Sequence, residues 1–247
     1  MSAKTKRIIF TSVAIIFWLF IWQAAALIID HSFLLPSIPE TTVALLEIFT
    51  SGSFFKATFL TLIRVITGLS SGIAIGIVLS VLSHKYEIVK AIVSPMVSII
   101  KSTPVASFIV ILWIMMNGSA LAVFIAVLMV MPIIWQNMLD GYNAVDRELS
   151  EVCEIYEISA VKKFKLLIFP TLKKFMIPAI ITSAGLAWKS EIAAEIIAYT
   201  KNSIGQNIND AKYNMETATV FAWTIIIIIL SIIIEKTAKH FLARYDV

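Results

Sequence analysis

The stretch VASFIVILWIMMNGSALAVFIAVLMVMPIIWQNML, residues 105–139, decides the fold, because it runs for 35 residues without a charged side chain. About 20 apolar residues suffice to cross the hydrocarbon core of a bilayer. The stretch is therefore too long for one crossing, and Asn117-Gly118-Ser119 within it is a turn signal. We predict two membrane spans that meet at this turn.

The composition of the whole chain agrees with a membrane protein. Of its 247 residues, 59% are hydrophobic and 15% are charged, whereas soluble domains average about 45–50% apolar and about 25% charged residues. The run Ile8–Ile29 is 22 residues long, which exceeds the apolar region of a signal peptide, about 7–15 residues. We expect an uncleaved first span there, within a single all-α integral membrane domain over residues 1–247.

Six spans account for the remaining apolar runs. Segment 30–56 holds Leu35-Pro36-Ser37 and then an amphipathic stretch, Glu40–Thr50, which is either a helix on the membrane surface or an ordered loop. The second span carries three glycines at a spacing of four, Gly68, Gly72 and Gly76, which predict a close helix contact within or between chains. The spans are expected at about residues 8–29, 59–83, 88–116, 119–139, 175–198 and 217–234.

The placement of Lys and Arg predicts the orientation of these spans. With both termini in the cytoplasm, the inside segments hold fourteen Lys and Arg residues and the outside segments hold three. Cytoplasmic loops carry the excess of basic residues in membrane proteins. The inside segments are then 1–7, 84–90, 140–174 and 235–247.

The inside segment 140–174 contains an amphipathic stretch, residues 147–170, which lies between two apolar runs. Asp146 is a helix cap, and Val152, Ile155 and Tyr156 share one helix face by the spacing of three and four. Ser159 is a cap for a second helix, with Val161, Phe164, Leu167 and Ile168 on one face and Pro170 at its end. An apolar face held in water needs a partner or the membrane, so this segment is either a docking surface or a polar loop with local helicity.

Five ionisable residues fall inside the predicted spans, where charges are costly and mark a pathway or an ion pair. We expect Lys101 and the charges of the fifth span to line a translocation path or to form ion pairs between helices, the second reading being favoured for Arg64. For Glu195 a structural or gating role is favoured over substrate contact. Two acids near a path would repel an anion. The candidate residues of the path are Lys101, Trp113, Trp188, Lys189, Glu191 and Glu195. The two tryptophans could instead be anchors at the membrane interface.

The sequence gives little support for catalysis or for cofactor binding by this chain. The lone Cys153 excludes an internal disulfide, and the three histidines lie far apart in sequence. No GxxxxGK[ST] phosphate loop is present, so we expect no enzyme activity, no cofactor in this chain and no nucleic-acid partner.

The amphipathic segment resembles the EAA loop of permease subunits of type I ABC importers. Glu151, Val152 and Cys153 lie where that motif has Glu-Ala-Ala, Ile168 and Pro170 match its end, and Glu157 takes the position of its glycine. A non-glycine residue at φ > 0 is strained, so either the turn here is ordinary or the first helix extends.

The order and spacing of further motifs carry the resemblance from about residue 35 to the C-terminus. Its closest branch is the nitrate, sulfonate and taurine group. The matching segments are Leu35-Pro36-Ser37, Thr61–Gly68, Lys101–Ala106, Ile111-Leu112-Trp113 with Gly118, Asp140-Gly141, Ala187-Trp188 with Ala194-Glu195, and Ile204-Gly205-Gln206.

The resemblance implies a six-helix permease that forms a substrate path in a bacterial plasma membrane. It implies a second copy of the chain, a cytoplasmic ATPase dimer that holds ATP and Mg, an external binding protein, and lipid as partners. Its substrate would be a small organic solute such as a sulfonate, a nitrate-like anion or a heterocyclic vitamin precursor. The coupling residues would be Glu151, Val152, Cys153, Ile155, Tyr156, Glu157, Phe164 and Pro170.

Two alternatives of other classes remain open from the sequence. One is the transmembrane component of an energy-coupling-factor importer, which also docks on ATPases. The other is a gradient-driven secondary transporter, which predicts internal repeats and broken helices.

Overall fold

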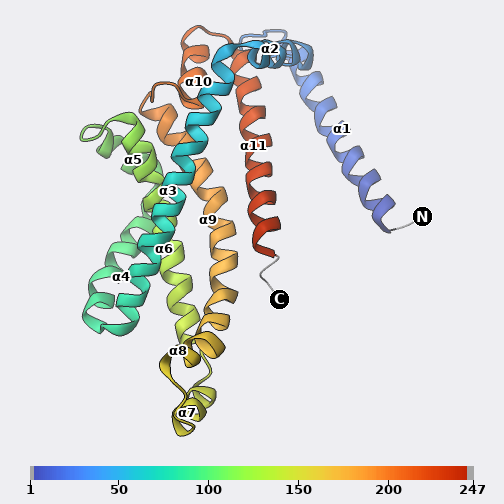
Figure 1. Cartoon of the computed structure of the whole chain (residues 1–247). Coiled ribbons are helices and arrows are strands. Elements are labelled where there is room, and N and C mark those ends of the chain that lie inside the picture. Colours follow the sequence, from blue (N-terminus) through green and yellow to red (C-terminus); the bar gives the residue numbers. More distant parts are fainter. Residues whose placement is uncertain (1–2, 244–247) are drawn as a thin grey trace.

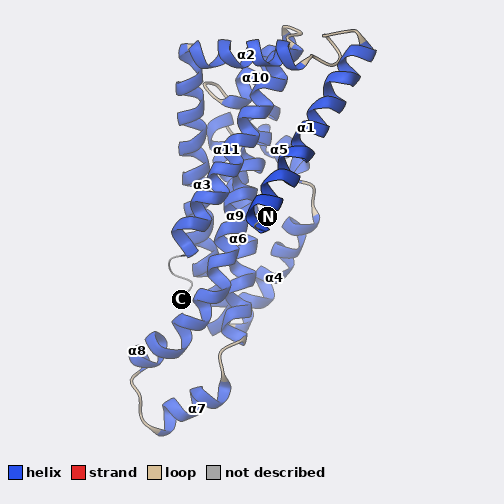
Figure 2. Ribbon diagram, turned by 90° about the vertical axis from the view of Figure 1, so that its right-hand side faces the viewer, coloured by secondary structure: helices blue, strands red, loops and turns tan. Residues whose placement is uncertain are grey.

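The computed structural model describes residues 3–243, and this part of the chain consists of helices and their connections (Figures 1 and 2). Residues 244–247 of the predicted inside segment 235–247, with the basic Arg244, lie outside the described residues. The all-α prediction is confirmed.

Helix α1 (Ala3–Ile29) stands apart from the other long helices and joins them through α2 (Ile38–Thr50), which lies across one end of the bundle (Figure 1). The Trp22 indole donates a hydrogen bond to the Pro36 carbonyl at 3.0 Å. A capping box begins α2: Ser37 Oγ accepts from the Glu40 amide, and the Glu40 carboxylate accepts from the Ser37 amide at 2.7 Å. The amphipathic stretch is therefore a helix and not an irregular loop.

Three long helices form the centre of the bundle: α3 (Gly52–Lys85), α6 (Gly118–Asn143) and α9 (Phe169–Ile197). Helix α6 packs against both of the others. A Cβ added to Gly68, Gly72 or Gly76 would lie only 2.5 to 2.8 Å from a Cβ of α6. The predicted glycine seam is confirmed, and it joins two helices of the same chain.

The third expected span, residues 88–116, is not one helix. It consists of α4 (Glu87–Ser102) and α5 (Val105–Trp113), whose axes are bent by 101°. The residue before a proline is pushed out of the helical region, and Thr103, which precedes Pro104, is extended with ψ of 132°. The prediction of a single span missed this signal.

The last two helices close the bundle on the side of α9. Helix α10 (Ile204–Tyr213) is short, and α11 (Thr217–Ala243) runs along α9 and contacts α2. The largest apolar core draws its buried residues from α2, α3, α6, α9, α10 and α11.

Within residues 3–243, four helices are long and apolar enough to cross a membrane, namely α1, α3, α6 and α11, and the bent pair of α4 and α5 would make a fifth. The expected fifth span lies in α9, which runs beside α6 and α11 (Figure 1). Helix α9 holds Lys189, Glu191 and Glu195, and it buries both glutamates inside the bundle. Its charges explain why α9 is less apolar than the other long helices.

Candidate functional sites

A protrusion extends beyond the bundle at the end opposite α2 (Figures 1 and 2). It consists of α7 (Arg147–Ile155), α8 (Ala160–Lys163) and a π-helical turn, Phe164–Ile168, that leads into α9. None of these three described elements contains a buried residue. The protrusion therefore keeps its shape through local hydrogen bonds and not through a core of its own.

Polar contacts fix the two helices of the protrusion. Asp146 caps α7, as predicted, because its Oδ1 accepts from the amides of Glu148 at 2.9 Å and Leu149 at 3.1 Å. Lys163 of α8 donates to the Glu154 carboxylate of α7 at 2.9 Å, and this hydrogen bond lowers the pKa of Glu154. The exposed pair is individually weak, but it sets how the two helices lie against each other.

Apolar side chains of the protrusion are uncovered. Ile155 is 77% exposed and Tyr156 is 76% exposed, and Val152 is exposed beside them. On the second helix, Val161 and Phe164 are also exposed. Leu149, one turn before Val152 on α7, is exposed as well, and exposed apolar faces of this kind mark an interaction site.

The turn between the helices departs from the sequence expectation. Helix α7 ends at Ile155, and Glu157 adopts φ of +48°, so the turn is not ordinary and the helix does not extend. This is the left-handed geometry that glycine adopts without strain. The chain thus holds a glycine-type turn without a glycine, and the Glu157 amide donates a hydrogen bond to the Glu154 carbonyl at 3.0 Å.

Pro170 does not end the second helix, contrary to the prediction. It lies in the first turn of α9, and the chain stays helical from Ala160 through the π-helical turn into α9. A proline inside a helix lacks the amide and clashes with the carbonyl four residues earlier. The π-helical turn, in which the Phe169 amide reaches the Phe164 carbonyl, widens the helix where that clash would fall.

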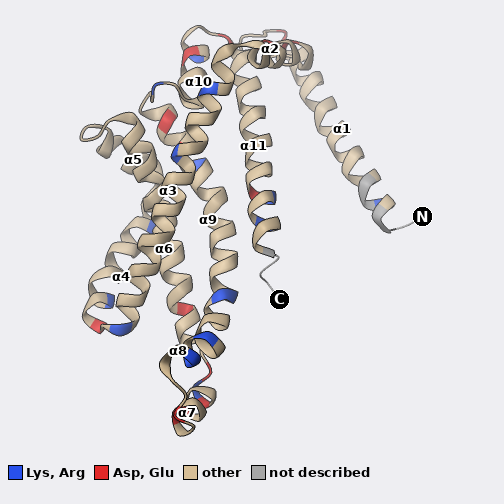
Figure 3. Ribbon diagram, viewed as in Figure 1, with Lys and Arg blue, Asp and Glu red and all other residues tan. Residues whose placement is uncertain are grey.

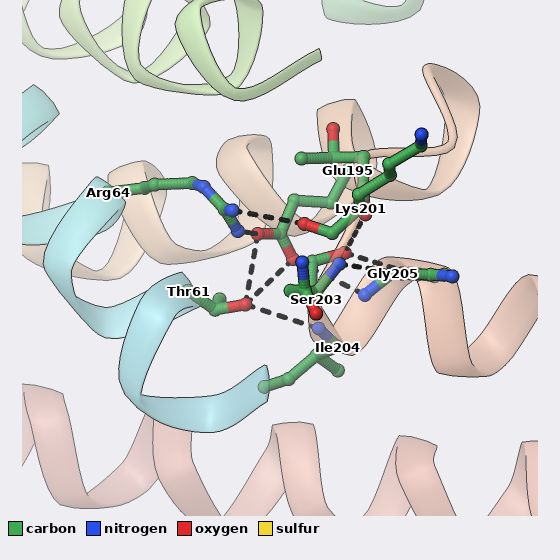
Figure 4. Close-up of polar contacts among 10 residues, drawn as sticks. Thr61, Arg64, Glu195, Lys201, Ser203, Ile204 and Gly205 are labelled. Carbon is green, nitrogen blue, oxygen red and sulfur yellow. Dashed lines mark hydrogen bonds and ion pairs between the residues drawn. The ribbon is translucent and has the colours of Figure 1, made fainter. Parts of the chain in front are cut away.

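A second polar cluster joins α3, α9 and α10 inside the bundle (Figure 4). The Glu195 carboxylate accepts from Arg64 Nη1 at 2.7 Å and from Thr61 Oγ1 at 2.9 Å. The Gly205 amide, in the first turn of α10, donates to the same carboxylate at 3.3 Å. The charge of Glu195 is thus met by a cation, a hydroxyl and a helix N-terminus.

Thr61 links the cluster together. Its hydroxyl donates to Glu195 and accepts from the Ile204 amide at 3.2 Å, while Arg64 Nη2 donates to the Lys201 carbonyl at 3.2 Å. Thr61 was not predicted as a site residue, although it lies three residues before Arg64 and so on the same face of the helix. Three separate motif segments, 61–68, 194–195 and 204–206, therefore meet at one site.

Two residues of the predicted path, Lys101 and Trp113, do not lie at this cluster. Lys101, at the end of α4, lines a pocket of about 370 Å³ with Ser98, Trp135 and Gln136. Trp113 is half exposed at the end of α5. The path role of these two residues stays a prediction.

Three residues of α9 occupy three different environments. Trp188 has no exposed surface, and its indole donates to the Ile227 carbonyl of α11 at 3.2 Å. Lys189 lies 3.9 Å from the Glu235 carboxylate of α11, with both side chains largely exposed. Glu191 is fully buried. Glu235 was not anticipated as a partner, because nothing in the sequence pairs α9 with α11.

Comparisons with known proteins agree with this architecture. The family described as binding-protein-dependent transport system inner membrane component matches residues 72–247. A Bacillus subtilis protein named as an aliphatic sulfonates transport permease, SsuC, is 24% identical over 209 residues, which cover 83% of this chain and 75% of the relative. A Methanocaldococcus jannaschii protein named as an ABC transporter permease, MJ0413, is 21% identical over 92% of this chain and 87% of its own length.

The fold is also found among solved structures. A chain of an amino acid ABC transporter, crystallised with histidines, superposes with a TM-score of 0.64 at 15% identity, over 78% of this chain and 92% of the other. The two chains share the type I importer permease fold.

Proposed function

This chain belongs to the family of inner membrane components of binding-protein-dependent transport systems, and we propose that it couples a cytoplasmic ATPase to a substrate path through its protrusion. It is the permease subunit of an ABC importer.

The observation that carries the proposal is the exposed apolar surface of the protrusion. Val152, Ile155 and Tyr156 project from a helix that has no core beneath it. Such a surface is stabilised when it enters a groove of a partner, and flanking charges then fix its register. Helix α8 and the π-helical turn run without interruption into α9, and Lys163 of α8 is bound to Glu154 of α7, so movement of a docked ATPase would be transmitted to the centre of the bundle.

Co-purification of the ATPase tests this docking. Aspartate at positions 152, 155 and 156 is expected to abolish the association, because three charges would have to enter an apolar groove. Lys162→Asp is the matched control, since it changes an exposed charged residue of the same protrusion and should leave most of the association. Retention of the ATPase by the triple variant would refute the docking surface.

Labelling of the lone thiol gives a second test of the same contact. Cys153 is free, partly exposed and adjacent to Val152. A bound ATPase should slow the reaction of Cys153 with a maleimide. Equal labelling rates with and without the ATPase would place the docking elsewhere.

We further propose a small anionic solute such as an organic sulfonate as the substrate. The sulfonate name of the Bacillus relative suggests this class, and the pocket at Lys101 offers a cation beside Ser98, Ser102 and Gln136. Uptake measured in vesicles with the complete transporter should fall with Lys101→Met and persist with Lys101→Arg. Unchanged uptake by Lys101→Met would remove Lys101 from the path and would leave the docking proposal intact.

The remaining partners follow from the same family membership. We propose that two copies of the chain enclose the path, that a binding protein delivers the solute at the α2 end, and that the protrusion lies in the cytoplasm. The excess of basic residues in the segments predicted to lie inside supports this orientation.

A further inference from the structure

Glu191 is a carboxyl group that receives no hydrogen bond from the residues that the structure describes. It lies in α9 with 0% of its surface exposed. Among residues 3–243, neither Glu191 Oε1 nor Oε2 has a hydrogen-bond partner. An isolated carboxylate is strongly disfavoured in such a setting, and a buried acid of this kind is neutralised instead.

Glu195, one helical turn away, provides the contrast. Its carboxylate accepts from Arg64, from Thr61 and from the first turn of α10. Those donors stabilise a negative charge at Glu195, and the structure gives Glu191 no equivalent. The two acids share a face of α9 because they are four residues apart, so a charge at Glu191 would also be repelled by Glu195.

The charges on the neighbouring helices leave Glu191 uncompensated. On α3, Arg64 is already bound to Glu195, Lys56 lies in the second turn, and His84 and Lys85 lie in the last turn. Lys189 lies about 160° around α9, from 3.6 residues per turn, and faces Glu235.

The other helices packed against α9 bring no cation. Helix α5 has no charged residue, and α6 has only Asp140 in its last turn. The charges of α11 begin at Glu235, more than four turns from its start. In α10, Asp210 accepts a hydrogen bond from Tyr199, and Lys212 lies in the last turn.

We infer that Glu191 is a proton-binding site and that the cluster of Arg64, Glu191 and Glu195 is electrically neutral because Glu191 carries a proton. The ligand of the site is the proton itself. As long as the proton stays bound, Thr61, Arg64 and Glu195 fasten α3, α9 and α10 together. Loss of the proton places a second negative charge beside a single arginine and weakens that fastening, so the cluster is sensitive to alkaline pH.

This inference does not depend on the substrate or on the ATPase. It does remove one difficulty for an anionic solute, because a neutral cluster does not repel an anion as two carboxylates would.

Infrared spectroscopy of the purified full-length chain in lipid nanodiscs tests the inference directly. At neutral pH, the wild-type protein should show the C=O stretching band of a protonated carboxylic acid. Glu191→Gln should lose this band, and Asp210→Asn should keep it. A wild-type spectrum with carboxylate bands only, or a protonated band that survives in Glu191→Gln, would overturn the inference.

Thermal stability as a function of pH gives an independent test. The unfolded chain releases the Glu191 proton in the ordinary glutamate range, about pH 4–5, and the inference requires the folded protein to keep it above that range. The folded state then binds more protons than the unfolded state, so wild-type stability falls as pH rises above that range. Glu191→Gln has no proton to lose and should show a shallower fall.

The glutamine variant is nearly the shape of the neutral acid, so below about pH 5 it should melt within about 2 °C of the wild type. Identical pH slopes for both proteins would contradict the inference. So would a wild-type melting temperature that rises with sodium or potassium at fixed pH and fails to do so in Glu191→Gln, because the ligand would then be a metal cation. Should Glu191→Gln fail to accumulate, the wild-type infrared band titrated against pH decides alone.

Discussion

At the scale of single residues, the structure separates charges that the sequence shows only as neighbours. Lys189, Glu191 and Glu195 lie within seven positions of one helix. The first is exposed beside Glu235, the second is buried without a partner, and the third is buried against Arg64. Three charged residues of one helix therefore have three different physical environments, set by which helix faces each of them.

Arg64→Ala is expected to destabilise the protein severely. It leaves the Glu195 carboxylate buried and unpaired, and breaking a buried pair in this way costs about 3–5 kcal/mol. Lys189→Ala is the matched control, because its pair with Glu235 is largely exposed and exposed pairs contribute about 0–1 kcal/mol. Melting temperatures in detergent measure both, and equal shifts for the two variants would contradict the role of burial.

Glu157→Gly is expected to be tolerated and to stabilise the protrusion. Glu157 adopts φ of +48°, and a non-glycine residue in the left-handed region costs about 1 kcal/mol or slightly more. Glycine at position 157 removes that cost without touching the apolar surface. Association with the ATPase should be retained, and its loss would mean that the Glu157 side chain takes part in the contact.

At the scale of elements, α3 and α6 meet in a close seam. Gly68, Gly72 and Gly76 let the two helix backbones approach closely. The contact between α3 and α6 continues toward the C-terminal end of α3, where Ser83 accepts a hydrogen bond from the Trp135 indole at 3.0 Å. Helix packing in lipid relies on such close contact because lipid tails are as apolar as leucine.

Gly72→Val tests the seam. The new Cβ would lie 2.7 Å from the Val130 Cβ and 3.3 Å from the Val127 carbonyl oxygen, so α3 and α6 must separate. Overpacking of this kind costs about 1–3 kcal/mol or more. Gly52→Ala is the control, since nothing lies within 4 Å of its added Cβ. A Gly72→Val protein as stable as the control would contradict the packing of these helices.

At the scale of the whole molecule, the two ends of the bundle differ in chemistry (Figure 3). The protrusion end carries basic residues from several elements, among them Lys85 in the last turn of α3 and Lys162 and Lys163 in α8. The opposite end carries α2 and α10, capped by Ser37 and Ser203. The segments predicted to lie outside hold three Lys and Arg residues, against fourteen in the segments predicted to lie inside. This asymmetry is the physical basis of the predicted orientation.

Accessibility of the lone thiol tests the orientation. A membrane-impermeant maleimide should label Cys153 in inside-out vesicles and fail to label it in intact spheroplasts. A cysteine introduced at Asn214, an exposed residue at the end of α10, should react in the opposite pattern. Labelling of Cys153 in intact spheroplasts would place the protrusion outside the cell.

Much of the fold could be predicted from the sequence because it depends on local composition. Long apolar runs place α1, α3, α6 and α11, the Asp146 cap begins α7, and the glycine spacing marks the contact face of α3. The break at Pro104 was also encoded, since a proline restricts the residue before it, but the apolar run around it concealed the break.

The candidate sites were predictable only in part. The apolar face of α7 follows from helical periodicity. The left-handed conformation of Glu157 and the continuous helix through Pro170 depend instead on how α7 and α8 pack in the protrusion. The partners of Lys189, Glu191 and Glu195 depend on which helices are neighbours, and residues 61 and 195 are too far apart in sequence for any local pattern to join them.

The sequence by itself determined that this protein is an all-helical membrane chain with an amphipathic segment between two apolar ones, because burial of apolar side chains in lipid acts on each helix separately. Only the tertiary structure decided that Arg64 neutralises Glu195 and that no described residue neutralises Glu191. The reason is that compensation of a buried charge depends on distances between helices, and those distances exist only after the helices have packed.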